Sequence, residues 1–262
     1  MTHSVNQQKF LNEYKRNKIF IRSTRILIFV LFLSLWEVSA RVGWIDSFIF
    51  SSPSRIVMTF FELLSGHGLL EHVGITLMET IISFLLVILF STGLATILWI
   101  FPKCFAVLEP YFVVLNSLPK SALAPLLIVW LGANMRTIII AGMSVAIFGA
   151  TISLYTGFRE IDSDKQKLIQ TLGGSKWDTL TKVILPASIP IQISTMKVNI
   201  GLCLVGVVIG EFIGAKQGLG YLIIYSSQTF KLDWMLMSIV ILCVMAMLLY
   251  QILNTIEKFI TK

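Results

Sequence analysis

Long apolar runs alternate with short polar segments along most of the chain, and this pattern predicts a helical membrane protein. A helix needs about 20 apolar residues to cross the hydrocarbon core of a bilayer. Six stretches meet this requirement, at residues 20–42, 74–100, 105–131, 135–158, 193–215 and 234–256. The third stretch contains Pro110, Pro119 and Pro125, so we expect it to be broken.

Two connecting segments have helical patterns of their own. Ser52 and Pro53 fit the N-cap and first position of a helix. The apolar residues that follow recur at helical spacing, which predicts an amphipathic helix on the outer membrane face; they are Ile56, Phe60, Leu63 and Leu64. Residues 214–230 begin rich in glycine and then become apolar, as is typical of a re-entrant or interfacial helix.

Composition and charge agree with one integral membrane domain. The chain has 262 residues, of which 56% are hydrophobic and 13% are charged, about half the charged fraction of a soluble domain. The net charge of +7 comes from Lys and Arg between the spans, which favours membrane topology over nucleic-acid binding. These residues concentrate before the first span, after the second, fourth and sixth, and so predict that both termini are cytoplasmic. Three widely spaced cysteines give no disulfide framework and no zinc pattern.

The most polar internal stretch, residues 159–192, predicts two short helices joined by a sharp bend. Asp162, Ser163 and Asp164 fit the cap of a helix that begins near Lys165, and Gly173 or Gly174 fits the left-handed position that ends it. A second helix begins at Ser175, because Asp178 completes a capping box. Its apolar stripe is Trp177, Leu180 and Ile184, and Pro186 is expected to close it. On pattern alone, an ordinary interfacial loop explains this stretch equally well.

The same residues resemble the cytoplasmic signature loop of the permeases of type I ABC importers. That loop reads roughly Glu-Ala-Ala, three residues, Gly, about nine residues and Ile-x-Leu-Pro. Gly173 takes the glycine position, and Ile184, Leu185 and Pro186 match the end without the intervening residue. Lys167, Leu168 and Ile169 stand at the Glu-Ala-Ala positions. Residues 52–64, 108–132 and 208–235 are similar to the nitrate, sulfonate, taurine, bicarbonate and thiamine-precursor subfamily.

This resemblance implies a homodimeric permease with two copies of a separate ATPase and an extracytoplasmic substrate-binding protein. It implies a division into residues 1–25 (cytoplasmic tail and helix entry), 26–70 (first span and external helix) and 71–257 (permease core). Within the core, the coupling loop at 159–192 would contact the ATPase. The contact residues would be Lys167, Gln170, Leu172, Gly173, Gly174, Ser175, Trp177, Leu185 and Pro186.

The sequence has no G-x-x-x-x-G-K-[ST] motif and no metal-ligand spacing, so we expect no cofactor on this chain and no enzymatic activity. ATP and Mg²⁺ would be bound by the partner ATPase. A secondary transporter is the rival interpretation, but we find no repeated pair of broken helices, which that class would favour.

Polar residues within the spans are candidates for a solute pathway, because a charge inside a membrane is costly and often functional. They are Asn116, Ser117, Lys120, Asn199 and Glu211. Lys120 would suit an anionic solute, or would reach an interface with its long side chain. Glu211 would pair with Lys120, line the pathway, or lie at the outer edge, where we expect it. His67 and His72 are expected to be solvated loop residues.

Overall fold

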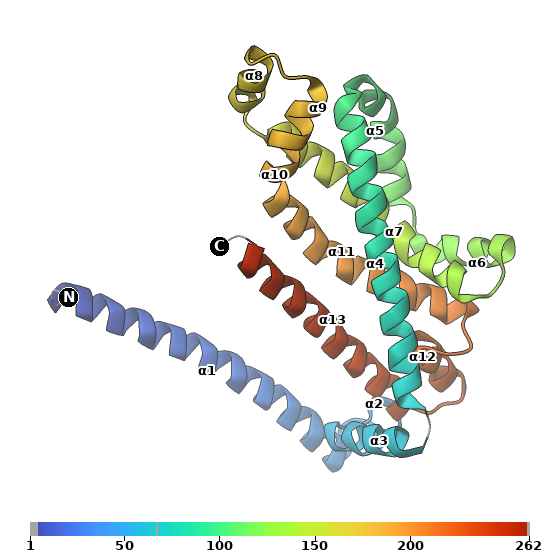
Figure 1. Ribbon diagram of the computed structural model, residues 1–262. Helices are drawn as coiled ribbons and strands as arrows, with labels where there is room; N and C mark the ends of the chain where they lie inside the picture. Colours follow the sequence, from blue (N-terminus) through green and yellow to red (C-terminus); the bar gives the residue numbers. More distant parts are fainter. Residues whose placement is uncertain (1–4, 67, 261–262) are drawn as a thin grey trace.

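All regular structure in the described part of the chain is helical. The computed structural model describes residues 5–66 and 68–260 (Figure 1). The elements are α1 (Val5–Val42), α2 (Ser47–Phe50), α3 (Pro53–Gly66), α4 (Leu69–Ile100), α5 (Pro102–Ser117), α6 (Lys120–Leu131), α7 (Met135–Glu160), α8 (Ser163–Thr171), α9 (Lys176–Thr179), the π-helix η1 (Leu180–Ile184), α10 (Leu185–Ala187), α11 (Ile189–Gly214), α12 (Leu219–Gln228) and α13 (Leu232–Ile260).

Five of these helices, α1, α4, α7, α11 and α13, are long and apolar enough to cross a membrane. The sixth predicted span is the pair α5 and α6, which meet at an angle of 94°. The break falls at Leu118 and Pro119, both in extended conformation, because a proline disfavours helix in the residue before it. The prediction of an all-helical chain with about six spans, the third of them broken, is confirmed.

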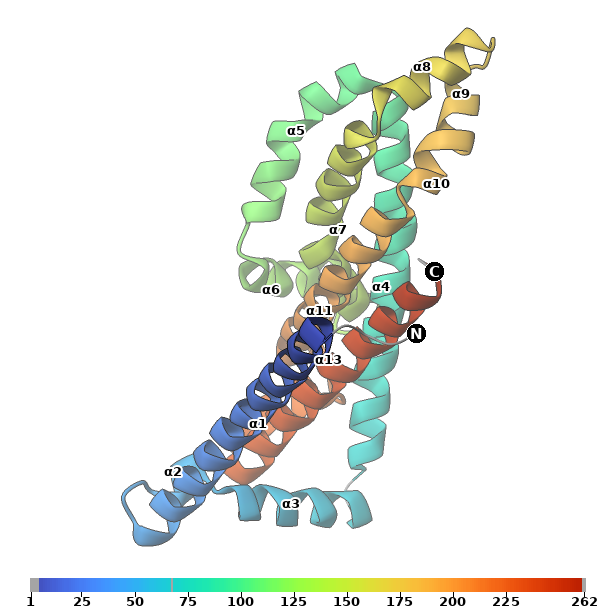
Figure 2. The ribbon, with the colours of Figure 1, turned by 90° about the vertical axis from the view of Figure 1, so that its left-hand side faces the viewer.

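The core of the bundle is a close crossing of α4, α7 and α11 (Figures 1 and 2). Small residues permit this approach: a Cβ atom on Gly206 of α11 would lie 2.8 Å from the Cα of Gly142 on α7. Gly210, one turn further along α11, faces Ile138 of α7 in the same way. Close contact of small residues is a common way for helices to associate in membranes, where water does not drive them together.

At one end of the bundle, α3 lies across the other helices, as its amphipathic pattern predicts (Figure 2). Ile56 and Leu63 are buried, and Arg55 donates to Asp233 at the start of α13 over 2.6 Å. Leu64 is 41% exposed and does not join the buried face. The predicted re-entrant helix is α12, which begins after the glycine-rich loop and buries Leu222.

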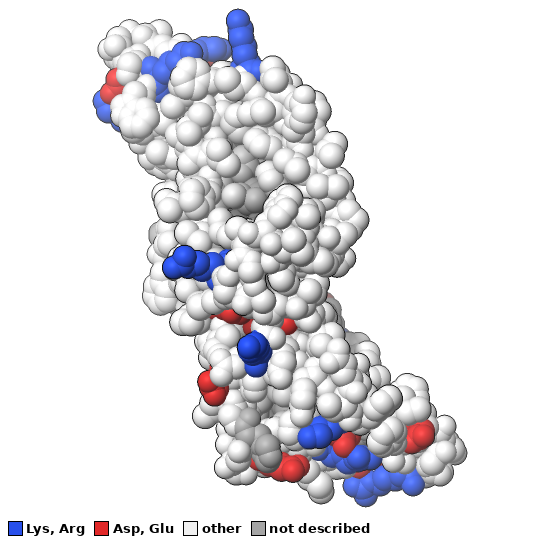
Figure 3. Space-filling view, turned by 90° about the vertical axis from the view of Figure 1, so that its right-hand side faces the viewer, with Lys and Arg blue, Asp and Glu red and all other residues white. Residues whose placement is uncertain are grey.

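The first span stands apart from the other spans. In Figure 1, α1 diverges from α13, and its main contacts are with α2 and α3 at its C-terminal end. From residue 13 onward most of its large apolar side chains are therefore exposed, and they would face lipid or another protein chain in a membrane. Figure 3 shows a wide uncharged surface that starts below the basic residues at the α8–α9 end of the molecule. Such a surface is expected of a chain surrounded by lipid.

Candidate functional site

The helices α8 and α9 form a bent hairpin at the end of the bundle opposite α3 (Figure 1). The Asp162 carboxylate accepts a hydrogen bond from the backbone N–H of Asp164 and so caps α8. The helix begins at Ser163, two residues before the predicted start. Gly173 has a φ of +81°, and Gly174 N–H donates to the carbonyl of Ile169 over 2.9 Å. This is the Schellman arrangement that ends a helix with glycine.

The second arm of the hairpin starts with the predicted capping box. The Ser175 hydroxyl accepts from Asp178 N–H, and the Asp178 carboxylate accepts from Ser175 N–H over 3.0 Å. Hydrogen bonds from Lys182 and from Ser175 hold the pKa of the Asp178 carboxyl well below its usual range. The carboxylate therefore stays ionised, and the cap persists across the physiological pH range.

The prediction that Pro186 closes this arm is wrong. The chain stays helical through α9, η1 and α10, and only Ser188 separates it from α11. In η1 the helix widens, and Leu185 N–H bonds to the carbonyl of Leu180, five residues back. A π-type turn changes the register of the carbonyls in front of the proline ring, which lets the chain accommodate Pro186 without breaking.

The base of the hairpin is fixed to the membrane-spanning helices. Leu180 and Ile184 are fully buried in a cluster with Leu98 of α4 and with Tyr155 and Phe158 of α7. Trp177, the third member of the predicted apolar stripe, is 62% exposed. The stripe is therefore divided between a buried base and an exposed tip.

Most of the predicted coupling residues lie at this exposed tip. Leu172 is 75% exposed and Trp177 62%, and the backbone bend at Gly173 lies between them. Leu168 of α8, which stands at one of the Glu-Ala-Ala positions and was not a predicted contact, is also exposed. Leu185 and Pro186 lie instead at the base. Large apolar side chains on a polar hairpin are typical of a protein-binding surface.

The positive φ at position 173 favours glycine, and this preference can be tested by substitution. Gly173→Ala should destabilise the bend by about 1 kcal/mol, because a residue with a Cβ atom rarely adopts a positive φ. Gly173→Asn should be milder, because asparagine tolerates this conformation. Limited proteolysis of the hairpin in membranes checks both variants. Equal protease resistance in Gly173→Ala and the native chain would contradict the assigned bend.

A second feature is a polar cavity of about 340 Å³ between α5, α7 and α11. Asn116 and Asn199 both line it, so the structure brings these two predicted pathway residues together. The lining residues are Asn116, Gly149, Ser153, Ser194, Thr195, Val198, Asn199 and Leu202. Gly149 makes room for the Asn116 amide, because a Cβ atom there would lie 3.1 Å from its oxygen. The cavity offers hydroxyl and amide groups that can hydrogen-bond to a small solute.

The other predicted pathway residues lie elsewhere. Lys120 begins α6 directly after the break; its ammonium donates to the carbonyl of Leu115 and lies 5.6 Å from the ring centre of Phe148, beside Gly149. Ser117 donates to the Val113 carbonyl and does not line the cavity. Neither Lys120 nor Ser117 lines the cavity, although the Phe148 ring under Lys120 belongs to the residue that precedes Gly149 in α7.

Glu211 lies at the end of α11 beside the α11–α12 loop, but it is buried there, and no ion pair joins it to Lys120. Glu211 is 1% exposed and accepts from the Thr76 hydroxyl over 2.6 Å. The prediction of a solvated His72 is wrong, because its Nδ1 accepts from Gly218 N–H and its ring stacks on Tyr221. His67 lies outside the described residues. These contacts join α4 to the start of α12, a long-range pairing without a local sequence signal.

Comparison with known proteins gives a consistent result. Residues 88–262 match the family described as the binding-protein-dependent transport system inner membrane component. A probable ABC transporter permease protein of Haemophilus influenzae is 31% identical over 225 residues, which are 86% of this chain and 91% of that protein. The putative aliphatic sulfonates transport permease protein SsuC of Bacillus subtilis is 25% identical over 241 residues, 90% of this chain and 86% of the relative.

Among solved structures, a chain of the MetNI methionine ABC transporter in an inward-facing conformation superposes with a TM-score of 0.67. It is 17% identical, and the match covers 74% of this chain and 96% of that one, so it establishes a shared fold. The family match covers more than half of the chain, and the multi-pass helical bundle agrees with it. This chain therefore belongs to the inner-membrane components of binding-protein-dependent transport systems, the permease subunits of ABC importers.

Proposed function

We propose that this chain moves a small anionic solute of the sulfonate, nitrate or taurine class across the cytoplasmic membrane by alternating access. A separate ATPase would supply the energy and hold ATP and Mg²⁺, because this sequence has no phosphate-binding motif. An extracytoplasmic binding protein would deliver the solute, and a second copy of the chain would complete the translocation path. Family membership and the sulfonate-permease relative support this proposal.

The observation that carries the proposal is the hairpin with a buried base and an exposed apolar tip. Leu172 and Trp177 would bind a groove on the ATPase, in the place that the resemblance gives to the coupling loop. Leu180 and Ile184 would pass the displacement to α4 and α7, with which they share a core. Closely packed interiors transmit such displacements because they deform little.

The experiment is reconstitution of the chain with the ATPase and binding protein from the same source in proteoliposomes. Uptake should require internal ATP and all the components, and an ATPase without its catalytic residue should stop it. Uptake that continues without the ATPase and follows an imposed ion gradient would establish the rival secondary transporter instead.

The charge of the solute is testable at Lys120. Lys120→Gln should lower the uptake of a sulfonate roughly 10- to 100-fold, the effect of one hydrogen bond to a charged group. The expected position of the solute is the cavity of Asn116 and Asn199; Lys120 lies over the ring of Phe148, whose neighbour in α7, Gly149, lines that cavity. Radiolabelled taurine, nitrate and a neutral pyrimidine, each supplied with its own binding protein, are suitable probes.

The matched control is Lys231→Gln. Lys231 also lies over an aromatic ring, 4.2 Å from the ring centre of Trp234, but it precedes α13 and does not line the cavity. This variant should transport normally. Equal loss in both variants, or a neutral pyrimidine transported by the native chain and by Lys120→Gln alike, would contradict an anionic solute held by Lys120.

A further inference from the structure

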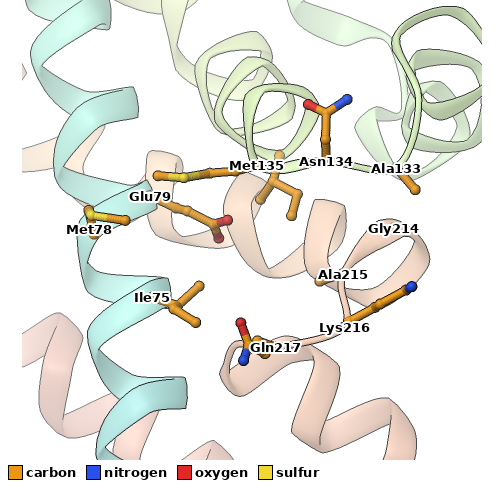
Figure 4. A pocket seen from close by; sticks show the side chains of 11 residues that line it. Ile75, Met78, Glu79, Ala133, Asn134, Met135, Gly214, Ala215, Lys216 and Gln217 are labelled. Atoms are coloured by element: carbon orange, nitrogen blue, oxygen red, sulfur yellow. The ribbon is translucent and has the colours of Figure 1, made fainter.

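Two acidic side chains meet inside the bundle, away from the polar cavity of α5, α7 and α11. Glu79 of α4 is 2% exposed and Glu211 of α11 is 1% exposed. The hydroxyl of Thr76, one turn before Glu79 on α4, donates to the Glu211 carboxylate, which places the two acidic side chains close together. Figure 4 shows the Glu79 carboxyl pointing from α4 into a space bordered by the loops that carry Asn134 and Lys216. This space is a cavity of about 390 Å³.

Glu211 has the surroundings of an ionised carboxylate. Its Oε1 accepts from the Thr76 hydroxyl, and its Oε2 accepts from Gly220 N–H over 2.5 Å. The glycines of the loop make this approach possible: a Cβ atom on Gly218 would lie 2.3 Å from Oε1, and one on Gly220 would lie 2.7 Å from Oε2. The Thr76 hydroxyl also accepts from Leu219 N–H over 2.8 Å. The backbone at the start of α12 is thus built around one negative charge.

Glu79 has the opposite surroundings. Its Oε2 is buried and has no hydrogen-bond partner among the described residues. No Lys or Arg in the described part of the chain lies within salt-bridge distance of Glu79 or Glu211. By contrast, each partly buried carboxylate elsewhere in residues 13–260 has a basic partner; the pairs are Glu37 with Arg41, Asp178 with Lys182, Asp233 with Arg55 and Glu257 with Lys197.

The remaining polar groups around the pair do not neutralise a second charge. From α4 come Glu71 and His72, from the loop Lys216 and Gln217, from α12 Tyr221, and from the start of α7 Asn134. Glu71 is bound to Gln217, and His72 to the backbone of Gly218. Two buried carboxylates in contact repel each other strongly, and such pairs normally share one proton.

We propose that Glu79 and Glu211 form a proton-binding site that holds one proton and fastens the outer α11–α12 loop to α4. The proton comes from solvent through the adjoining cavity and resides on Glu79, which donates to the Glu211 carboxylate. The pair then carries a single negative charge, for which Thr76 and Gly220 supply the hydrogen bonds. When the proton leaves, two charges face each other and push α4 away from the loop. This inference does not depend on the solute.

Infrared difference spectroscopy tests the site in the purified full-length transporter in lipid nanodiscs. The native chain at neutral pH should show the carbonyl band of a protonated carboxylic acid, because exposed carboxyl groups are ionised there. Glu79→Gln should lose that band while its amide still donates to Glu211. The matched control is Glu71→Gln, an exposed glutamate at the same end, which should keep the band.

Absence of the band from the native transporter would overturn the proposal whatever the variants do, and so would its persistence in Glu79→Gln. If the band is absent and added Na⁺ raises the melting temperature, the pair binds a metal cation instead of a proton. That result would also overturn the proposal.

The pH dependence of stability gives an independent measurement. A folded state that keeps a proton which the unfolded state releases loses stability as pH rises. The ratio of folded to unfolded native chain should fall by up to about tenfold per pH unit while the folded chain still holds the proton. In Glu79→Gln this loss should disappear, whereas Glu71→Gln should follow the native chain. Parallel melting curves for all three proteins from neutral to alkaline pH would contradict the proton site.

Discussion

Replacement of Leu172 and Trp177 together by alanine is expected to abolish ATP-driven uptake while the chain still inserts and folds. Both side chains are more than half exposed, so their removal costs the isolated permease little. If both side chains are buried in an interface with the ATPase, truncating either one should cost about 2 kcal/mol or more of binding free energy. The affinity for the ATPase should therefore fall at least about 30-fold. Co-purification of the ATPase at several concentrations and uptake by proteoliposomes measure the effect.

The control for this variant is Lys182→Ala on the same arm of the hairpin. It removes an exposed ion pair of 2.8 Å with Asp178, and such pairs contribute little to stability. Uptake and ATPase binding should stay close to the native values. If the double variant binds the ATPase as well as Lys182→Ala does, the tip of the hairpin is not the docking surface, although the family assignment would stand.

The parts of the hairpin that the sequence predicted are those set by neighbours within about five residues. Asp162 caps α8, Ser175 and Asp178 complete a box, and Gly173 turns the chain, and each depends on a side chain or a φ angle next to it. The membrane spans were predicted for the same reason, because each is a run of consecutive apolar residues. The broken third span also followed from its prolines, with the break at Pro119.

The parts that the sequence did not predict depend on tertiary contacts. Pro186 normally ends a helix, but the burial of Leu180 and Ile184 against α7 favours a continuous, locally widened helix. The contact between Glu79 and Glu211 joins helices far apart in the chain, and neither residue carries a local pattern that indicates the other. Asn116 and Asn199 were found as polar residues in apolar spans, but their common cavity required the fold.

Gly206→Ala is expected to destabilise the bundle by about 2 to 3 kcal/mol, although alanine is the better helix former. The added methyl group would lie 2.8 Å from the Cα of Gly142 and 2.9 Å from the carbonyl oxygen of Ala141. These are backbone atoms of α7, so no side-chain rotation relieves the contact, and α7 and α11 must separate. Thermal unfolding of the purified chain in detergent should show a lower melting temperature.

The same substitution at Gly201, five residues earlier in α11, provides the control, because a Cβ atom there has no neighbour within 4 Å. Gly201→Ala should leave the melting temperature unchanged or raise it, because alanine favours the helix over glycine by up to about 1 kcal/mol. The two variants thus differ only in what faces the new methyl group. If Gly206→Ala has the same melting temperature as Gly201→Ala, α7 and α11 are further apart at their crossing than in the structure. The hairpin would then lack a rigid connection to the pathway, since α7 carries both Phe158 at the hairpin base and Gly149 at the cavity.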